Sequence, residues 1–351
     1  MSKEIVLKGR FISDKKFIDS INNGDLDNLF KYLESNKEKY NLTIRDDKIT
    51  LYSYGRGVNI KKNVDNYVIS FNLNTASLYS EEELDKLIIF LSKYNFDTSK
   101  YSEWKINKKE NNILSAKIYD NEIKKYDFKT ILDELCKVFE SYKDSRKEET
   151  FKQEFTYAYD NDRNDYIVFD TEYEHSFDVT SDKNNAGKII KADLAALKKY
   201  NDKYRVVFIE LKQNVNTSVS GNSSNIGDHI IDTLNFSKLY NSNLKEKERF
   251  IKYVKFNLEF KVKHNLLDIK DIKNILDNID FSESPDIIIV CGFDNETKEN
   301  LRNRLLSKFK RESKYKNYKE WKNTIIVGSC NTKILLEKGM PLNKFLEDTH
   351  E

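Results

Sequence analysis

Hydrophobic positions recur along this chain with two different periods, and the period separates the expected helices from the expected strands. Apolar residues return every three to four positions over 14–36, 80–95 and 128–144, which predicts amphipathic helices. Apolar and β-branched residues dominate 48–60 and 66–74, which predicts strands. The amino-terminal part of the chain therefore has the pattern of a small α+β domain, and its residues indicate no particular chemistry.

The remaining sequence has longer apolar strands separated by helical segments. The expected elements, in chain order, are a helix at 146–158, strands at 166–175, 188–197 and 204–213, a helix at 226–242 and a strand at 286–292. The connector KKYNDK has turn composition, so the second and third strands are expected to form an antiparallel hairpin. The charged segment KDSRKEE marks the expected boundary between an α+β domain at 1–145 and an α/β domain at 146–351.

The composition argues against a membrane protein, a secreted protein and a zinc-binding module, and adds little else to this interpretation. The 351 residues are 38% hydrophobic and 34% charged, which is typical of a soluble protein, and no apolar run approaches the ~20 residues of a membrane span. The amino terminus lacks the apolar region of a signal peptide. Cys136, Cys291 and Cys330 are far apart, so we interpret them as reduced thiols of a cytoplasmic protein without a zinc module. A formal net charge of +2 favours neither the presence nor the absence of a polyanionic partner.

A carboxylate and an ammonium group stand together at the end of a strand that should be buried. Residues 205–213, RVVFIELKQ, are apolar until Glu210 and Lys212, which are two apart and so share one face of a strand. If the hairpin closes near its expected turn, Asp193 lies beside Glu210 to within one residue. Burying one of these charged side chains without an opposite charge beside it would cost roughly several kcal/mol. A divalent cation would compensate the two acids, and carboxylate oxygens suit Mg²⁺.

This arrangement resembles the core of the PD-(D/E)XK nuclease superfamily, which has a restriction-endonuclease-like fold. Asp193 is followed by sixteen residues and then by Glu210-Leu211-Lys212, on a hairpin flanked by helices. The resemblance implies a metal-dependent nuclease that hydrolyses phosphodiester bonds, with DNA as the expected substrate and Mg²⁺ or Mn²⁺ as the cofactor. By position, Asp193 and Glu210 would be metal ligands, and Lys212 the catalytic lysine that orients the attacking water. Ala192 departs from the family pattern, which has proline before the first acid.

The family often adds an acid from further upstream. Glu172 is the first candidate for this third metal ligand, because the first core strand would bring it to the same edge, and Glu154 on the preceding helix is the second. A literal match to the motif also occurs at Pro285-Asp286 and Glu296-Thr297-Lys298. We reject this second match, because Glu296 and Lys298 are expected at the start of a helix, where residues two apart do not share a face.

Candidate nucleic-acid contacts lie after the motif. Residues 302–322 are rich in lysine and arginine with interleaved rings, a pattern that suits phosphates and stacked bases but equally a solvated helix and loop. The expected nucleic-acid-binding residues are Arg302, Arg304, Lys308, Lys310 and, after the motif lysine, Gln213. Asp228 and His229 open the next helix, where we interpret them as capping residues rather than as catalytic groups.

Two alternatives to a simple nuclease remain open from the sequence. The first is a catalytically silent domain of the same fold that binds nucleic acid or a protein partner. The second is a nuclease component of a bacterial antiviral defence system, either restriction-like or gated by the amino-terminal domain. Both a homo-oligomer and a complex with a partner protein are compatible with these sequence patterns.

Overall fold

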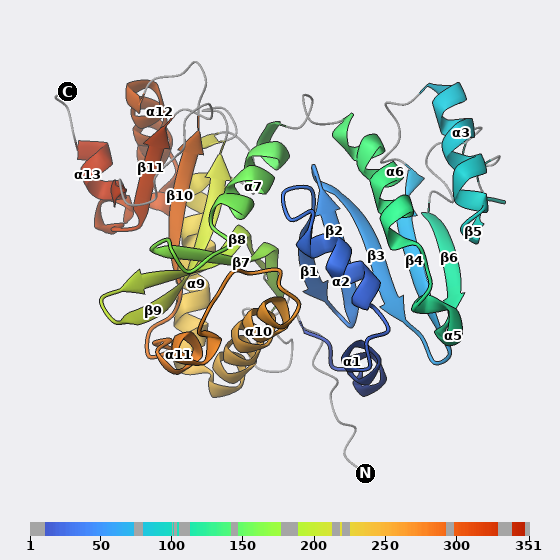
Figure 1. The fold of residues 1–351 in the computed structure, drawn as a ribbon. Helices are drawn as coiled ribbons and strands as arrows, with labels where there is room; N and C mark the ends of the chain where they lie inside the picture. Colours follow the sequence, from blue (N-terminus) through green and yellow to red (C-terminus); the bar gives the residue numbers. More distant parts are fainter. Residues whose placement is uncertain are drawn as a thin grey trace, which may run out of the picture. The chain divides into compact units, whose positions relative to one another are not determined.

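The computed structural model is a mixed α/β structure with two six-stranded sheets, one in each of two compact units (Figure 1). The first unit comprises residues 1–157 and 259–266, and the second comprises 158–258 and 267–351. The described residues are 11–73, 80–99, 101, 104, 113–141, 147–176, 189–212, 218–219, 225–292, 298–328 and 339–347.

The sheet of the first unit is antiparallel throughout, with the order β1-β2-β3-β4-β6-β5. Its strands are β1 (Asn41–Arg45), β2 (Lys48–Ser53), β3 (Arg56–Lys62), β4 (Asn66–Asn72), β5 (Phe96–Asp97) and β6 (Ile113–Tyr119). Its helices are α1 (Lys15–Asn22), α2 (Asp27–Glu34), α3 (Glu81–Ser92), α5 (Asp120–Ile123), α6 (Phe128–Glu140) and α7 (Lys147–Ala158). Helix α2 packs against α6, which also contacts β2.

Short turns with left-handed residues close the first two hairpins of this sheet. Asp46 and Asp47 join β1 to β2 with φ of 47° and 58°, and Tyr54 and Gly55 join β2 to β3 with φ of 48° and 73°. Two consecutive residues with positive φ give a turn whose twist matches that of the flanking strands. The turns therefore fix the register of a meander whose inward side chains form the core of the first unit.

The sheet of the second unit has the order β12-β11-β10-β9-β8-β7. Its strands are β7 (Tyr166–Ser176), β8 (Ile189–Tyr200), β9 (Lys203–Lys212), β10 (Asp286–Gly292), β11 (Thr324–Gly328) and β12 (Met340–Pro341). Strands β7, β8 and β9 form an antiparallel meander, β9, β10 and β11 are parallel, and β12 returns antiparallel. The helices that connect or follow these strands are α9 (Ile226–Ser242), α10 (Leu244–Lys263), α11 (Ile272–Asp277), α12 (Lys298–Arg311) and α13 (Leu342–Glu347).

An aromatic cluster fastens α9 and α10 to this sheet. The Phe208 ring on β9 stacks on Tyr173 of β7 with centroids 4.6 Å apart, and it meets Phe236 of α9 and Phe250 of α10 edge to face. All four rings are buried. Aromatic pairs in these geometries each add about 0.5–1.5 kcal/mol beyond the area that they bury. Because side chains alternate along a strand, the residues that share the face of Phe208 also point toward these helices.

Most elements expected from the sequence are present. The hairpin of β8 and β9 closes through Asn201 and Asp202, inside the predicted connector. The helices expected at 146–158 and 226–242 correspond to α7 and α9. The compact units divide between Tyr157 and Ala158, so that nearly all of α7 belongs to the first unit, whereas the sequence interpretation placed it with the second.

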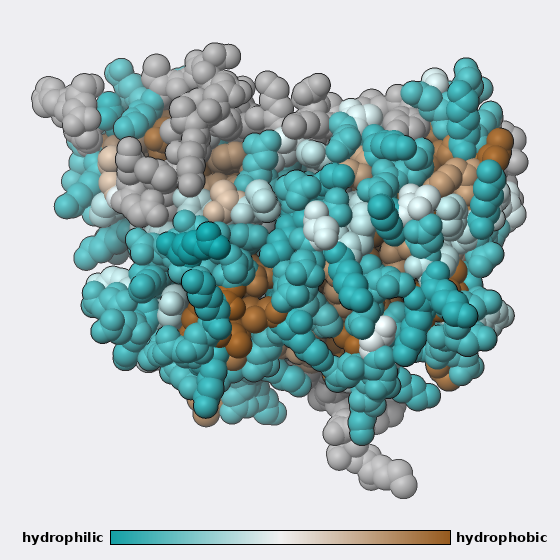
Figure 2. Space-filling model, in the orientation of Figure 1, coloured by the Kyte–Doolittle hydropathy of each residue, from teal (hydrophilic) through white to brown (hydrophobic). Residues whose placement is uncertain are grey.

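The surface has the polar character that the composition indicates. Hydrophilic side chains cover most of the face in Figure 2, and hydrophobic side chains show in separate patches. The large apolar side chains that are exposed among the described residues lie on several elements and include Ile89 on α3, Ile113 on β6 and Leu244 on α10. No helix of the described residues is long and apolar enough to cross a membrane.

Candidate active site

The end of β9 directs two opposite charges into the interior of the second unit. Glu210 and Lys212 share the face of Phe208, which α9 and α10 cover, and they are only 3% and 4% exposed. Lys212 Nζ donates to Glu210 Oε1 at 2.6 Å. The pair is thus a buried ion pair, for which removing one partner alone typically costs about 3–5 kcal/mol.

A second cation meets the same carboxylate oxygen. His229 Nε2, on the first turns of α9, lies 2.9 Å from Glu210 Oε1, and His229 Nδ1 lies 3.4 Å from the backbone oxygen of Lys191. His229 is buried, because it falls on the helical stripe of Ile226 and Ile230 that faces the sheet. The helical period therefore aims the imidazole at the strand that carries the acid.

The two cations hold Glu210 in its charged form. Burial opposes ionisation of this carboxyl, but the charges of His229 and Lys212, with the hydrogen bond from Lys212, prevail and lower its pKa to about 2. Burial also disfavours the charged form of His229, yet the Glu210 carboxylate raises the pKa of the imidazole above its usual range. The cluster consequently brings an ammonium group and an imidazole to one oxygen of a buried carboxylate.

Asp193 lies beside this cluster on β8. The ladder between β8 and β9 pairs Leu194 with Ile209, and this register puts Asp193 next to Glu210. The backbone N–H of Leu211 donates to Asp193 Oδ2 at 2.8 Å, so the aspartate carboxylate touches the strand between Glu210 and Lys212. The sequence estimate of the hairpin register is therefore correct to within its one-residue margin.

Glu172 occupies a strained position opposite Asp193. The pairing of β7 with β8 shifts between Val168 and Asp170, and Glu172 falls between the pairs Thr171–Leu194 and Tyr173–Ala192. Its φ is 53°, a left-handed conformation that costs a residue with a side chain on the order of 1 kcal/mol or more. The register thus aligns Glu172, Asp193 and Glu210 across three neighbouring strands.

This alignment does not amount to a preformed metal cage. Among the residues that the structure describes, no three or more histidine, cysteine, aspartate or glutamate side chains are grouped to hold a metal ion. The hard carboxylate oxygens of Asp193 and Glu210 nevertheless fit Mg²⁺, which commonly takes one or two protein carboxylates and completes its shell with water and phosphate. Both protein cations bind Oε1 of Glu210, which leaves Oε2 as the oxygen of that carboxylate for an ion.

Cys291 is the nearest thiol to the cluster along the sheet. It is paired with Lys212 in the parallel ladder of β9 and β10 and is fully buried. Burial raises the pKa of the thiol to about 12 despite the nearby ammonium. A thiol that stays protonated near neutral pH is a poor nucleophile, so thiolate chemistry is not what this site favours.

A polar network holds the start of α9, and with it His229. Asn225 is the N-cap, and its side chain accepts from the Asp228 backbone N–H at 3.2 Å. Asp228 Oδ1 accepts from Lys314 Nζ at 2.6 Å and from the Tyr315 hydroxyl at 2.8 Å. Asp228 is thus a bridge to the segment after α12, whereas His229, which we expected to be a capping residue, reaches Glu210.

Gly227 lets the start of α9 pack closely against the rings of Tyr315 and Phe309. A Cβ atom at Gly227 would lie 2.6 Å from the Tyr315 ring and 2.9 Å from the Phe309 ring, distances at which these buried rings would have to move. The helix start therefore rests directly on an aromatic cluster from α12 and the segment after it. Glycine is required here for space rather than for backbone conformation.

The rings of the basic segment form this cluster and are not a platform for bases. Phe309, Tyr315, Tyr318 and Trp321 are buried, and the Phe309 centroid lies 5.1, 5.7 and 5.3 Å from those of the other three. The interpretation of these rings as stacking partners for nucleic acid is therefore wrong. Their apolar surface is buried where α12 packs against the turns that follow it. The alternation of rings with lysines in the sequence gave no sign of this packing.

The cations of α12 differ in their availability. Lys310 is exposed, and Arg302 and Arg304 are half-buried. Lys308 is buried and its Nζ lies 3.3 Å from Glu312 Oε1, just past the end of α12, so it is already neutralised within the protein. Lys308 consequently fits a structural ion pair better than the phosphate contact expected from the sequence.

Some sequence candidates fall elsewhere. Gln213 and Glu296 lie outside the described residues. Lys298 begins α12, which agrees with rejecting the second motif match. Glu154 is exposed on α7 in the first unit.

No family model matches the chain, and neither the curated proteins nor the solved structures compared with it gave a match. The resemblance to PD-(D/E)XK nucleases thus remains a prediction carried by the motif and its geometry.

The raised pKa of His229 predicts a pH dependence of stability for the metal-free protein. A raised pKa contributes stability that is full below the unfolded value of about 6.5 and is lost as pH rises through the folded value. We expect the free energy of unfolding of the whole protein to fall as pH rises above about 6.5, and His229→Gln to flatten the fall. Urea denaturation in EDTA at a series of pH values above about 6.5 measures the free energy of unfolding of the wild type and of His229→Gln.

His264→Gln is the matched control, because burial lowers the pKa of that imidazole to about 4 and keeps it neutral over the same range. An equal alkaline loss in wild type and His229→Gln would contradict the charged interaction with Glu210.

Proposed function

We propose that the second unit is a metal-dependent nuclease that hydrolyses phosphodiester bonds, with DNA as the expected substrate. One observation carries the proposal. Glu210 and Lys212 are buried side by side at the end of β9, and the Asp193 carboxylate binds the peptide N–H between them. These residues form the acid, acid and lysine set on a hairpin. The parallel strand β10, which follows α9, α10 and α11, supports a restriction-endonuclease-like core around them.

The side chains divide the chemistry between them. Asp193 and Glu210 would hold Mg²⁺, and a bound ion would stabilise the charge that develops on the phosphoryl oxygens. Lys212 would position the attacking water and stabilise negative charge in the transition state. His229 fixes the orientation of Glu210 through the shared oxygen Oε1, which is a positioning role. Glu172, opposite Asp193, is the candidate for a third acid.

The same cluster is also compatible with a second function, that of a catalytically silent domain that binds nucleic acid or a protein. Lys212 and His229 already neutralise Glu210, so the buried carboxylate is compensated without a metal ion. A domain of this fold that only binds nucleic acid or a protein would be stable with such an internal ion cluster. Cleavage and binding measurements on the same variants separate the two functions.

The lysine variant tests catalysis. Lys212→Ala should lower the cleavage rate by about 10²–10⁴-fold, because a positioned acid–base group commonly contributes that much. Binding of a DNA duplex should change little. The measurement is cleavage of plasmid and linear DNA by protein whose fold is verified by circular dichroism.

Lys273→Ala on α11 removes an exposed lysine of the same unit and is the matched control. Lys212→Ala leaves the buried Glu210 with one cation fewer, which can destabilise the fold. A second variant therefore combines Glu210→Gln with Lys212→Met, so that both charges are removed together, and it should also be inactive. Normal cleavage by both variants would leave the silent binding domain as the better interpretation of the site.

Metal removal tests the cofactor. EDTA should abolish cleavage by the wild-type protein, and added Mg²⁺ or Mn²⁺ should restore it, since carboxylates are hard oxygen ligands. Cleavage assays over a series of metal concentrations measure this requirement. Undiminished activity in excess EDTA would exclude the metal from the mechanism.

The α12 cations predict a separate effect on binding. Arg302→Ala with Lys310→Ala should weaken DNA binding and reduce the slope of log affinity against log salt by about 0.9 for each phosphate that the variant no longer neutralises. Fluorescence anisotropy at several salt concentrations measures the slope. Lys238→Ala with Lys255→Ala removes two exposed lysines from α9 and α10 as a control. Equal slopes for the two double variants would remove α12 from the interface.

A further inference from the structure

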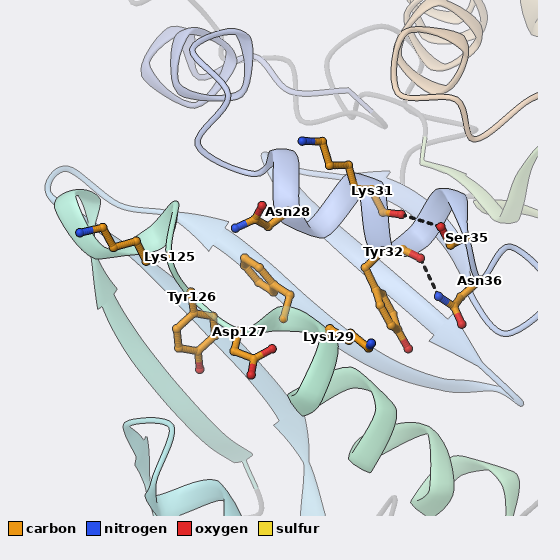
Figure 3. A pocket seen from close by; sticks show the side chains of 10 residues that line it. Asn28, Lys31, Tyr32, Ser35, Asn36, Lys125, Tyr126, Asp127 and Lys129 are labelled. Carbon is orange, nitrogen blue, oxygen red and sulfur yellow. Dashed lines mark hydrogen bonds between the residues drawn. The ribbon is translucent and has the colours of Figure 1, made fainter.

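The pocket of the first unit lies between α2 and the turn before α6 (Figure 3). Two of its lysines, Lys31 and Lys125, point away from it. Its acid, Asp127, is engaged in capping α6, where the carboxylate accepts from the Thr130 backbone N–H at 3.0 Å. The charged groups of this pocket therefore do not converge on a ligand, whereas polar groups in the second unit converge at the start of α9.

The start of α9 has more hydrogen bonds than a helix cap needs. The Asn225 side chain accepts from the Asp228 backbone N–H, and the Asn225 backbone oxygen accepts from the His229 N–H at 3.2 Å. These bonds alone make an ordinary helix start. Tyr315 adds a further donor from the short 3₁₀ helix after α12, Ser313–Tyr315. Its hydroxyl donates toward Asn225 Oδ1 at 3.0 Å and Asp228 Oδ1 at 2.8 Å.

These three side chains hold one another in place. Asn225 Nδ2 donates to Asp228 Oδ2 at 2.5 Å, so the hydroxyl, the amide and the carboxylate form a closed ring of contacts. Asn225 and Tyr315 are 0% exposed, and hydrogen bonds to a carboxylate away from water are stronger than those between neutral groups in water. The ring of contacts therefore fixes the first turn of α9.

The Tyr315 hydroxyl is itself anchored by packing that does not involve that hydroxyl. The Tyr315 ring centroid lies 5.1 Å from that of Phe309 and 6.1 Å from that of Trp321, and all three rings are buried. Replacing the tyrosine by phenylalanine therefore removes the donor and keeps the ring in this packing.

The first turn of α9 transmits its position to Glu210. His229 follows Asp228 in the sequence, and His229 Nε2 lies 2.9 Å from Glu210 Oε1. A shift of the first turn moves the imidazole and, with it, the carboxylate that it meets. In enzymes a misplacement of about 1 Å in such a group can cost about 10²-fold in rate.

We propose that Tyr315 is a positioning residue of the site, whose hydroxyl holds the His229 imidazole on Glu210 through Asn225 and Asp228. The effect of Tyr315 on cleavage rests on the proposed nuclease function, but its effect on His229 does not. Because Tyr315 is fully buried, it acts through these residues and not by touching a substrate.

A double-mutant cycle of cleavage rates with linear DNA and Mg²⁺ tests the proposal. Tyr315→Phe should lower kcat by about tenfold with little change in KM, because the site is displaced and the DNA contacts are not. In a His229→Gln background the same change should lower kcat by less than about twofold, since the imidazole that it positions is absent. An equal loss in both backgrounds, or a change in KM alone, would overturn the proposal.

Tyr240→Phe is the matched control. Tyr240 is buried near the other end of α9, and its hydroxyl donates to the Phe281 backbone oxygen at 2.9 Å. This variant also removes one hydroxyl bond from α9 and should leave kcat unchanged. A loss as large as that of Tyr315→Phe would mean that any loosening of α9 slows cleavage, which would overturn the specific role of Tyr315.

Nitrogen NMR of the His229 imidazole in EDTA at constant pH separates this proposal from the nuclease function. Tyr315→Phe should shift the His229 Nε2 signal, and Tyr240→Phe should not, while the His264 signals stay unchanged in both. If the wild type cleaves no DNA but the His229 signal shifts in Tyr315→Phe, the nuclease function is wrong and the positioning of His229 is supported. An unshifted His229 signal in Tyr315→Phe would overturn the positioning whatever the cleavage result.

Discussion

The second unit depends on the neutralisation of one buried carboxylate. Glu210 is buried on the same face of β9 as Phe208, which α9 and α10 cover, and an unpaired charge there would cost about several kcal/mol. Lys212 and His229 meet it on a single oxygen and hold it ionised. This requirement ties together features that are far apart in sequence, since the N-cap at Asn225, the bridge from Asp228 and the contact at Gly227 all fix the helix that delivers the imidazole.

Local pattern was sufficient to predict the strands and the relative positions of Asp193, Glu210 and Lys212. The apolar run before Glu210 and the turn composition after Tyr200 predicted the hairpin and its register, and these two features place Asp193 beside Glu210. The register depended on one connector, whose short turn leaves little freedom for slippage. The relative positions of the two acids and the lysine therefore follow from signals within a stretch of about twenty residues.

The remaining features depended on tertiary packing. His229 lies in the buried stripe of α9, a signal that was present, but its position near the helix start favoured a capping role that Asn225 fulfils. The rings of α12 and the segment after it alternate with lysines as they would on a stacking surface, yet they pack into a core of their own. The shift in β7 and the left-handed Glu172 follow from strand pairing, for which no local pattern existed.

The bond from the Leu211 amide to Asp193 joins the backbone of the hairpin to the charge of the site. A backbone carbonyl cannot change its charge, but a carboxylate weakens as an acceptor when it takes up a proton or a cation. At the open end of the β8–β9 hairpin a side-chain carboxylate therefore accepts the bond, so the last contact between these strands beyond the Leu194–Ile209 pair depends on a charged group.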